Sequence, residues 1–187
     1  MNASSLRSIL LVYENPLYYF LGEKIGDGID GEVFEKVGDT DKVLKLSRAL
    51  DRDSKLSGCL NFIVDKEPSY LVRLLEFGKT YAYNNNNDEI EAIYYYEMER
   101  LHPLSEDEQK VFHSLLSHED ANKRKSPTEE MIDELSCHLT FDVKLMKEFC
   151  QAVATGPIVH KDIHPRNIMK NKDGAYKLID LDRLEKR

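Results

Sequence analysis

Apolar and polar residues alternate along much of the first half of the chain, with the period expected of strands that bury one face. The alternation runs over 32–37 and resumes over 42–46, on either side of the turn-forming sequence Gly-Asp-Thr-Asp at 38–41. Two alternating segments separated by a short polar turn are typical of a β-hairpin. The sequence therefore predicts that the chain reverses at 38–41.

A second pair of strands is predicted over 70–77 and 90–98, separated by a polar tip of consecutive asparagines at 84–87. Between the two pairs, the apolar positions of 51–64 are compatible with one short helix, although Gly58 lowers the helix propensity there. The first half of the chain is therefore expected to consist of two strand pairs with one helix between them.

The period changes in the second half of the chain, where apolar residues recur at helical spacing. Ser105, followed by acidic residues at 106–108, predicts the beginning of a helix. A charged, turn-prone break follows at 123–127. We then expect a single helix over 128–154, ended by the Thr-Gly-Pro sequence at 155–157.

Strands followed by helices indicate an α+β chain. We expect one domain over 1–187, composed of a strand-rich N-terminal lobe at 18–101 and a reduced helical C-terminal lobe at 105–187. The boundary between the lobes is expected near 101–104.

Composition narrows the classes of protein to which the chain can belong. The net charge of -8 and the pI of about 5.3 argue against nucleic-acid binding through a basic surface. No segment reaches the roughly 20 apolar residues that span a bilayer, and no cleavage site follows the short apolar run at 9–12. The three cysteines are widely separated, which is typical of reduced thiols. We therefore expect a protein that binds neither nucleic acid nor membranes and that is either cytoplasmic or secreted into a host cell. We also expect a monomer.

The most informative segment lies near the C-terminus, where His160 and Asp162 are followed by Asn167 and Asp180. Asn167 comes five residues after Asp162, and Asp180 comes thirteen residues after Asn167. Between them, apolar residues flank the turn-forming sequence 171–174, which predicts a short hairpin. Phosphoryl transfer requires an acceptor held in line and neutralisation of the polyphosphate charge. A carboxylate beside the acceptor hydroxyl and oxygen ligands for Mg²⁺ meet these needs.

These residues and gaps resemble the catalytic loop and the metal-binding aspartate of the protein-kinase-like superfamily. The resemblance implies that ATP is the phosphate donor and that Asp162 accepts or orients the proton of the acceptor hydroxyl. It also implies that Asn167 and Asp180 bind Mg²⁺, and that His160 braces the loop without reacting.

A glycine-rich segment precedes the first predicted hairpin, with Gly26, Gly28 and Gly31 followed by Val33. Similar glycines open dinucleotide-binding units, in which they lead into a helix. Here Gly31 leads into a predicted strand, which is similar to the phosphate-covering loop of kinases. The resemblance implies that these glycines and Val33 surround the nucleotide.

Val43 and Lys45 lie two residues apart on a predicted strand, so their side chains share one face, whereas Lys42 belongs to the other face. The segment resembles the lysine-bearing strand of kinases. The resemblance implies that Lys45 contacts the α- and β-phosphates and that Val43 contacts adenine.

Two further segments are similar to parts of the kinase nucleotide site. Met98 is expected beside the base, and the backbone from Glu99 to Leu101 is expected to contact adenine. Met169, two residues after Asn167, is expected beneath the base. Ordinary core packing is the alternative interpretation of both methionines.

The chain departs from the family pattern at several positions. The predicted helix at 51–64 contains no glutamate to pair with Lys45, which leaves Glu67 or Asp53 as candidates. Asp182 stands where the family has glycine, and it is either a second acidic ligand or a surface acid. The chain stops five residues after Asp182, before an activation segment, so we expect no regulation by activation-loop phosphorylation.

The residues inside the loop leave the acceptor open. The sequence Asp-Ile-His-Pro, with His164 and Pro165, resembles aminoglycoside and choline phosphotransferases as well as some microbial protein kinases. Arg166 is either placed to stabilise the transferring phosphoryl group or is a solvated loop residue.

The leading hypothesis is a minimal serine/threonine protein kinase. In size it resembles the minimal bacterial effector kinases of the HopBF type, which are delivered into host cells and modify a host chaperone. The alternatives are a small-molecule kinase of the aminoglycoside or choline type and a nucleotide-binding pseudokinase module. The joint presence of Lys45, Asp162, Asn167 and Asp180 argues against the pseudokinase.

Overall fold

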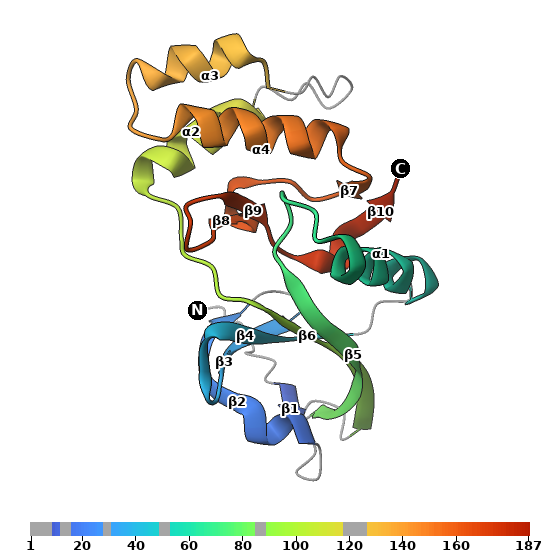
Figure 1. Ribbon diagram of the computed structural model, residues 1–187. Helices are drawn as coiled ribbons and strands as arrows, with labels where there is room; N and C mark the ends of the chain where they lie inside the picture. Colours follow the sequence, from blue (N-terminus) through green and yellow to red (C-terminus); the bar gives the residue numbers. More distant parts are fainter. Residues whose placement is uncertain (1–8, 12–15, 28–30, 49–52, 85–88, 118–126) are drawn as a thin grey trace, which may run out of the picture. The chain divides into compact units, whose positions relative to one another are not determined.

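The computed structural model describes residues 9–11, 16–27, 31–48, 53–84, 89–117 and 127–187 (Figure 1). These residues form helices and antiparallel strand ladders, which confirms the predicted α+β class. The chain divides into two compact units. Unit 1 comprises Met1–Asp53 and Leu74–Arg100, and unit 2 comprises Ser54–Arg73 and Leu101–Arg187.

Unit 1 is built on a six-stranded antiparallel sheet with the strand order β1-β5-β6-β4-β3-β2. Its elements are β1 (Ile9–Leu11), the short 3-10 helix η1 (Pro16–Phe20), β2 (Leu21–Asp27), β3 (Gly31–Lys36), β4 (Asp39–Arg48), β5 (Leu74–Asn84) and β6 (Glu89–Glu99). The strands β2, β3 and β4 form a meander. The strand β6 lies between β4 and β5, and it therefore joins the two predicted hairpins into one sheet.

The first predicted hairpin forms, but it reverses earlier than predicted. Lys36 is paired with Asp39, so the turn consists of Val37 and Gly38 and the chain is already in β4 at 39–41. Gly38 has a φ of +84°, which glycine adopts without the steric cost that other residues incur. The predicted turn at 38–41 was therefore wrong, because the glycine occupies the turn and the polar residues after it continue the strand.

The second predicted hairpin also forms, from β5 and β6. The strand β5 begins at Leu74, whereas the prediction placed the beginning at 70, and it extends to Asn84. Most of the predicted asparagine tip, at 85–87, lies outside the described residues.

One face of the sheet of unit 1 carries a small core. Leu46 and Ile93 are almost completely buried there. The partly buried side chains packed against these two are Leu17, Leu21, Phe34 and Tyr95. Burial of this apolar surface stabilises the meander against the β5–β6 hairpin.

Unit 2 holds the long helices and two small strand pairs. Its elements are α1 (Asp53–Lys66), α2 (Glu106–Ser117), α3 (Glu129–Ser136), α4 (Val143–Thr155), β7 (Ile158–His160), η2 (Pro165–Asn167), β8 (Ile168–Lys170), β9 (Tyr176–Leu178), η3 (Leu181–Arg183) and β10 (Leu184–Lys186). The first residue of α1 belongs to unit 1 and the rest of the helix to unit 2. The helix α1 confirms the helix predicted over 51–64, and β8 and β9 confirm the hairpin predicted around 171–174.

The single helix predicted over 128–154 was wrong, because the structure has the two helices α3 and α4 in its place. Thr128 caps α3, its Oγ1 accepting a hydrogen bond from Met131 N at 3.3 Å. Asp142 caps α4, its Oδ1 accepting from Leu145 N at 2.9 Å. An aspartate side chain that bonds the backbone three residues later favours a new helix start over continuation. The apolar spacing is helical on both sides of the break, so periodicity alone does not reveal it.

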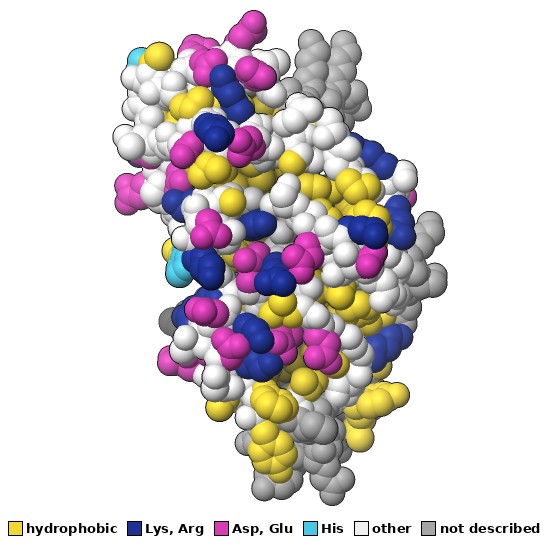
Figure 2. Space-filling model, viewed as in Figure 1, with side chains coloured by type: hydrophobic (Ala, Val, Ile, Leu, Met, Phe, Trp, Pro, Cys, Tyr) yellow, Lys and Arg dark blue, Asp and Glu magenta, His cyan; other side chains and the backbone are white. Residues whose placement is uncertain are grey.

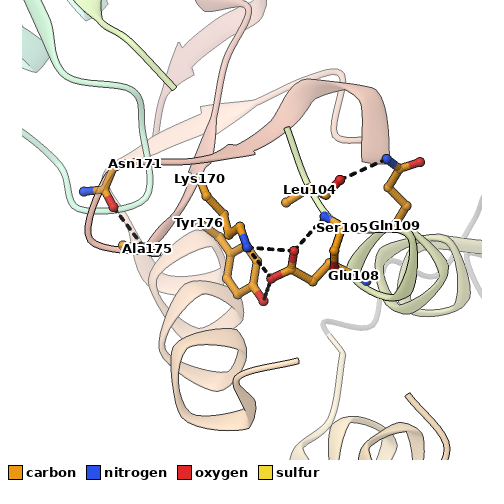
Figure 3. Close-up of polar contacts among 8 residues, drawn as sticks. All are labelled: Leu104, Ser105, Glu108, Gln109, Lys170, Asn171, Ala175 and Tyr176. Atoms are coloured by element: carbon orange, nitrogen blue, oxygen red, sulfur yellow. Dashed lines mark hydrogen bonds and ion pairs between the residues drawn. The ribbon is translucent and has the colours of Figure 1, made fainter. Parts of the chain in front are cut away.

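A buried glutamate ties the beginning of α2 to the β8–β9 hairpin (Figure 3). Ser105 N donates to Glu108 Oε2 at 2.8 Å and Glu108 N donates to Ser105 Oγ at 3.3 Å, which confirms the predicted helix start as a capping box. The same carboxylate accepts from Lys170 Nζ at 2.9 Å and from the Tyr176 hydroxyl at 2.8 Å. Since Glu108 is only 5% exposed, these bonds offset the cost of burying its charge.

Aromatic packing surrounds this carboxylate. Phe112 of α2, Phe149 of α4 and Tyr176 of β9 contact one another edge to face, with ring centroids 5.2–5.9 Å apart. The core of unit 2 therefore fixes the hairpin β8–β9 against two helices.

The face that Figure 2 draws is mixed in charge. Lysine and arginine side chains are interspersed there with aspartate and glutamate and with hydrophobic side chains. Among the described residues, no helix has the length and apolar character required to cross a membrane.

Candidate functional site

The predicted catalytic loop lies in unit 2 and begins where β7 ends at His160. The strand β7 pairs with β10, with His160 opposite Leu184, and Lys161 N donates to Arg183 O at 2.8 Å. The loop then passes through η2 into β8. Both ends of the loop are therefore anchored in strand pairs.

His160 is the centre of the loop and is only 2% exposed. Its Nδ1 accepts a hydrogen bond from Asp162 N at 3.2 Å, and its Nε2 lies 2.7 Å from Ile179 O. Because Nδ1 accepts, the ring proton belongs on Nε2, which donates to the Ile179 carbonyl. Burial lowers the pKa of His160, which favours the neutral ring that this arrangement needs. The side chain thus links the backbone of Asp162 to the residue before Asp180.

Asn167 makes a second set of links between the same segments. Its Nδ2 donates to Asp162 O at 2.9 Å and lies 3.4 Å from Asp162 Oδ2. Its backbone carbonyl accepts from Ile179 N at 2.9 Å. The structure therefore joins Asp162 and Asn167 in one network with Ile179, the residue directly before Asp180.

Asp180 has an unusual backbone conformation, with φ of 64° and ψ of 65°. Residues other than glycine rarely adopt this left-handed region, although aspartate tolerates it better than most. A strained residue held by its neighbours is common at functional sites. In the sequence of this chain, Asp180 is also the predicted metal ligand.

Asp182 is buried, with 5% exposure, next to the buried Leu181. The interpretation of Asp182 as a surface acid was therefore wrong. Burial of a carboxylate requires compensating interactions, so Asp182 contributes to the packing of the segment after Asp180.

The two predicted metal ligands have suitable chemistry for Mg²⁺. The amide nitrogen of Asn167 is committed to Asp162 O, which leaves the amide oxygen as the group that can bind a cation. Asp180 adds a carboxylate. Mg²⁺ is usually held by one or two such oxygen ligands together with phosphate oxygens and water, so this pair fits it. Among the described residues, no group of three or more His, Cys, Asp or Glu could hold a metal ion.

His164 lies beside the candidate base. Its Nδ1 accepts from Arg166 N at 3.2 Å, which caps η2, and its Nε2 lies 3.7 Å from Asp162 Oδ2. Asp162 and Arg166 are exposed, whereas Met169 is partly buried on β8 opposite Lys177. The side chains of Asp162 and Arg166 are therefore accessible from solvent.

The residues predicted to hold the nucleotide lie on the sheet of unit 1. The register pairs Lys45 with Val33 on one side and with Tyr96 on the other. Val43 is paired with Met98, so all of these side chains share one face of the sheet. The ammonium of Lys45 lies 5.9 Å from the centre of the Tyr96 ring.

Lys42 belongs to the opposite face, as predicted. Its Nζ pairs with Asp39 at 3.1 Å and with Glu97 at 3.2 Å. The strand parity that favoured Lys45 over Lys42 is therefore confirmed.

The glycine-rich segment joins β2 to β3. Gly26 is paired with Val33, and Gly28 lies outside the described residues. A Cβ added at Gly31 would lie 2.4 Å from the carbonyl oxygen of Leu46, so the pairing of β3 with β4 itself requires glycine there. Gly31 therefore has a structural role in addition to the predicted one.

The two candidates for the acidic partner of Lys45 are the first residue of α1 and the residue directly after the helix. Glu67 has a φ of 43°, and its carboxylate pairs with Arg73 at 3.0 Å within unit 2. Asp53 is the first residue of α1, and its side chain lies outside the described part.

The backbone predicted to contact adenine lies where the chain passes from one unit to the other. Glu99 ends β6 in unit 1, and Leu101 begins the second segment of unit 2.

No protein-family model matches this sequence, and no curated protein matches it either. The chemistry of the site therefore rests on its own residues and their geometry.

Sequence reasoning missed the role of Ile179, whose backbone bonds both His160 and Asn167. It also missed a cavity beside the loop, because the wall residues from α2 and α4 have the same apolar spacing as ordinary core residues. The one signal in the sequence that could have identified Ile179 is its position directly before Asp180, the candidate metal ligand.

Proposed function

We propose that this protein is an ATP- and Mg²⁺-dependent phosphotransferase with a kinase-like fold, and that its acceptor is a serine or threonine hydroxyl of a protein. The observation that carries the proposal is the network in which His160 and Asn167 tie Asp162 to Ile179 and hence to Asp180. Phosphoryl transfer depends on positioning and charge neutralisation, and such a network holds a base and metal ligands in fixed relation.

In the proposed reaction, Asp162 accepts the proton of the acceptor hydroxyl as the hydroxyl oxygen bonds to the γ-phosphorus. The bond from that phosphorus to the bridging oxygen of ADP breaks, and ADP leaves. Mg²⁺ held by Asn167 and Asp180 would neutralise the phosphate charge. Arg166, which is exposed two positions before β8, is available to stabilise the transferring group.

The strand arrangement of unit 1 supports the proposal independently. The glycine-rich segment joins the first two strands of the meander, β2 and β3, and Lys45 lies on the third strand, β4. In kinases a glycine-rich loop covers the phosphates and the phosphate-binding lysine lies on the third strand. Val33, Val43 and Met98 share the face of Lys45, and apolar residues on that face suit an adenine ring.

A second candidate is a small-molecule kinase, which His164 favours. The sequence Asp-Ile-His-Pro at 162–165 resembles that of aminoglycoside and choline phosphotransferases, and His164 Nε2 lies 3.7 Å from Asp162 Oδ2. The two candidates differ only in the acceptor.

The test is to incubate the protein with γ-labelled ATP and Mg²⁺, and to offer cell extract, a purified chaperone and a metabolite panel as acceptors. We expect label on protein serine or threonine. Asp162→Asn and Asp180→Asn should each reduce the transfer by at least about a hundredfold, the loss typical of a general base or an electrostatic group.

Asp173→Asn is the matched control, because Asp173 is an exposed carboxylate in the turn of the β8–β9 hairpin. It should leave the transfer unchanged. Label on metabolites alone would favour the second candidate, and nucleotide binding without any transfer would refute both.

A further inference from the structure

Unit 2 contains a cavity of about 410 Å³. Its volume lies within the range of about 300–1,000 Å³ that is typical of ligand sites. On the side of α2 and α4 its walls are apolar, formed by Phe112, Leu115, Leu116, Phe149, Cys150 and Val153.

The catalytic loop also lines the cavity. Lys161, Asp162 and Ile163 line the cavity together with the buried His160. An acceptor hydroxyl must come within hydrogen-bonding reach of the base, about 2.6–3.2 Å. The residue that would receive the proton therefore borders the cavity, and the groups next to the acceptor hydroxyl can occupy it.

The chemistry of the walls restricts the occupant. Asp162 carries the one acidic side chain among the described wall residues, whereas Lys161 and Arg187 carry basic side chains. The ammonium of Lys161 is paired with the carboxylate of Glu185. The guanidinium of Arg187 donates to Ala154 O, at the end of α4. A polycationic amino sugar would find one acidic partner and two cations here, whereas an apolar group would be surrounded by aliphatic and aromatic side chains.

Cys150 behaves as part of the apolar wall. Burial raises the pKa of its thiol to about 11, so the thiol is protonated at neutral pH. It contributes a small apolar surface and no negative charge.

We propose that this cavity anchors a large apolar side chain of the acceptor polypeptide, next to the hydroxyl that is phosphorylated. The inference rests on the proposed function, because that function makes Asp162 the base. It adds the substrate class: polypeptides that carry leucine or a similar residue near the target serine or threonine. Burial of one leucine side chain contributes enough to make such a residue a dominant determinant of affinity.

The experiment uses the full chain and short synthetic peptides with one serine and with leucine at one varied flanking position. Binding is measured by fluorescence anisotropy, and phosphate transfer is measured separately. We expect one leucine position to tighten binding and lower KM by about tenfold or more relative to alanine.

Val153→Phe should fill the cavity and abolish that preference, while ATP hydrolysis without peptide stays unchanged. Gln151→Phe is the matched control, because Gln151 is exposed on the same helix and is not a wall residue. Val153→Ala enlarges the cavity and should shift the preference from leucine to phenylalanine, which keeps the test informative if Val153→Phe folds poorly.

The proposal is overturned if no leucine position improves binding, or if Val153→Phe and Gln151→Phe bind the peptides alike. Phosphate transfer without any leucine preference would refute the anchoring site and leave the proposed function standing. Leucine-dependent binding that Val153→Phe removes, without any transfer, would refute the phosphotransferase and leave the binding site standing.

Discussion

Replacing His160 by phenylalanine should destabilise the protein and also change how its stability depends on pH. The ring is 2% exposed, so the substitution keeps the site filled by an aromatic ring but removes both hydrogen bonds. Asp162 N and Ile179 O, which lie 3.2 Å and 2.7 Å from the imidazole nitrogens, would lose these partners. Leaving such groups without partners costs about 1–3 kcal/mol each, so we expect the free energy of unfolding to fall by about 2–4 kcal/mol.

The pH dependence follows from the pKa of the buried ring. Burial lowers the pKa of His160 in the folded chain, although Ile179 O and the carboxylates of Asp180 and Asp162 act in the opposite direction. In the unfolded chain an imidazole has a pKa of about 6.5. Between that pH and the lower pKa of the folded chain, the imidazole of His160 is protonated in the unfolded chain and neutral in the folded chain. The contribution of His160 is therefore complete above pH of about 6.5, and it decreases as the pH falls, by up to about 1.4 kcal/mol per pH unit.

Urea unfolding at pH values of about 7 and about 5.5 measures both effects. The stability difference between the native chain and His160→Phe should be largest at the higher pH and should narrow at the lower one. Comparing the two proteins cancels the titration of the other groups. An equal difference at both pH values would refute the assignment of a neutral, buried His160.

Substitutions at three further positions test the backbone of the site, of the sheet and of the helix α1. Asp180→Gly and Asp180→Ala should both abolish phosphate transfer, but the glycine variant should be more stable by on the order of 1 kcal/mol, because glycine adopts the φ of 64° without strain and both variants lose the same carboxylate. A less stable glycine variant in calorimetry would contradict this. Gly31→Ala should lower the melting temperature, because the added Cβ would lie 2.4 Å from Leu46 O. Gly58→Ala in α1 should raise the free energy of unfolding by about 1 kcal/mol, because alanine has the higher helix propensity and nothing lies within 4 Å of the added Cβ. Equal effects of the two glycine substitutions would contradict the steric argument.

The sequence by itself determined the features that depend on short-range spacing. Alternation identified the hairpin strands β3 and β4, and β5 and β6, together with the faces of Lys42 and Lys45, but it did not identify β1 and β2. Ser105 and the acidic residues after it identified the beginning of α2. Strand parity and helix capping act over a few residues, so both can be read along the chain.

Predictions from short-range sequence patterns were wrong where two patterns favoured different structures for the same residues. Gly38 and the polar residues after it both suit a turn, and the pairing of β3 with β4 decided that only the glycine lies in it. The helical period continues through Asp142, and a single side-chain cap divided the predicted helix. In both cases the choice was between conformations of similar local free energy.

Only the tertiary structure decided the contacts between residues distant in the sequence. Three features depend on how the strand pairs and helices of unit 2 pack. They are the bonds of His160 to Asp162 N and Ile179 O, the burial of Asp182, and the cavity lined by the loop and by the helices α2 and α4. An isolated histidine, aspartate or leucine has the same local preferences in a core, on a surface or beside a cavity. Packing selects among these environments, and it does so through the burial of surface and the satisfaction of polar groups over the whole unit.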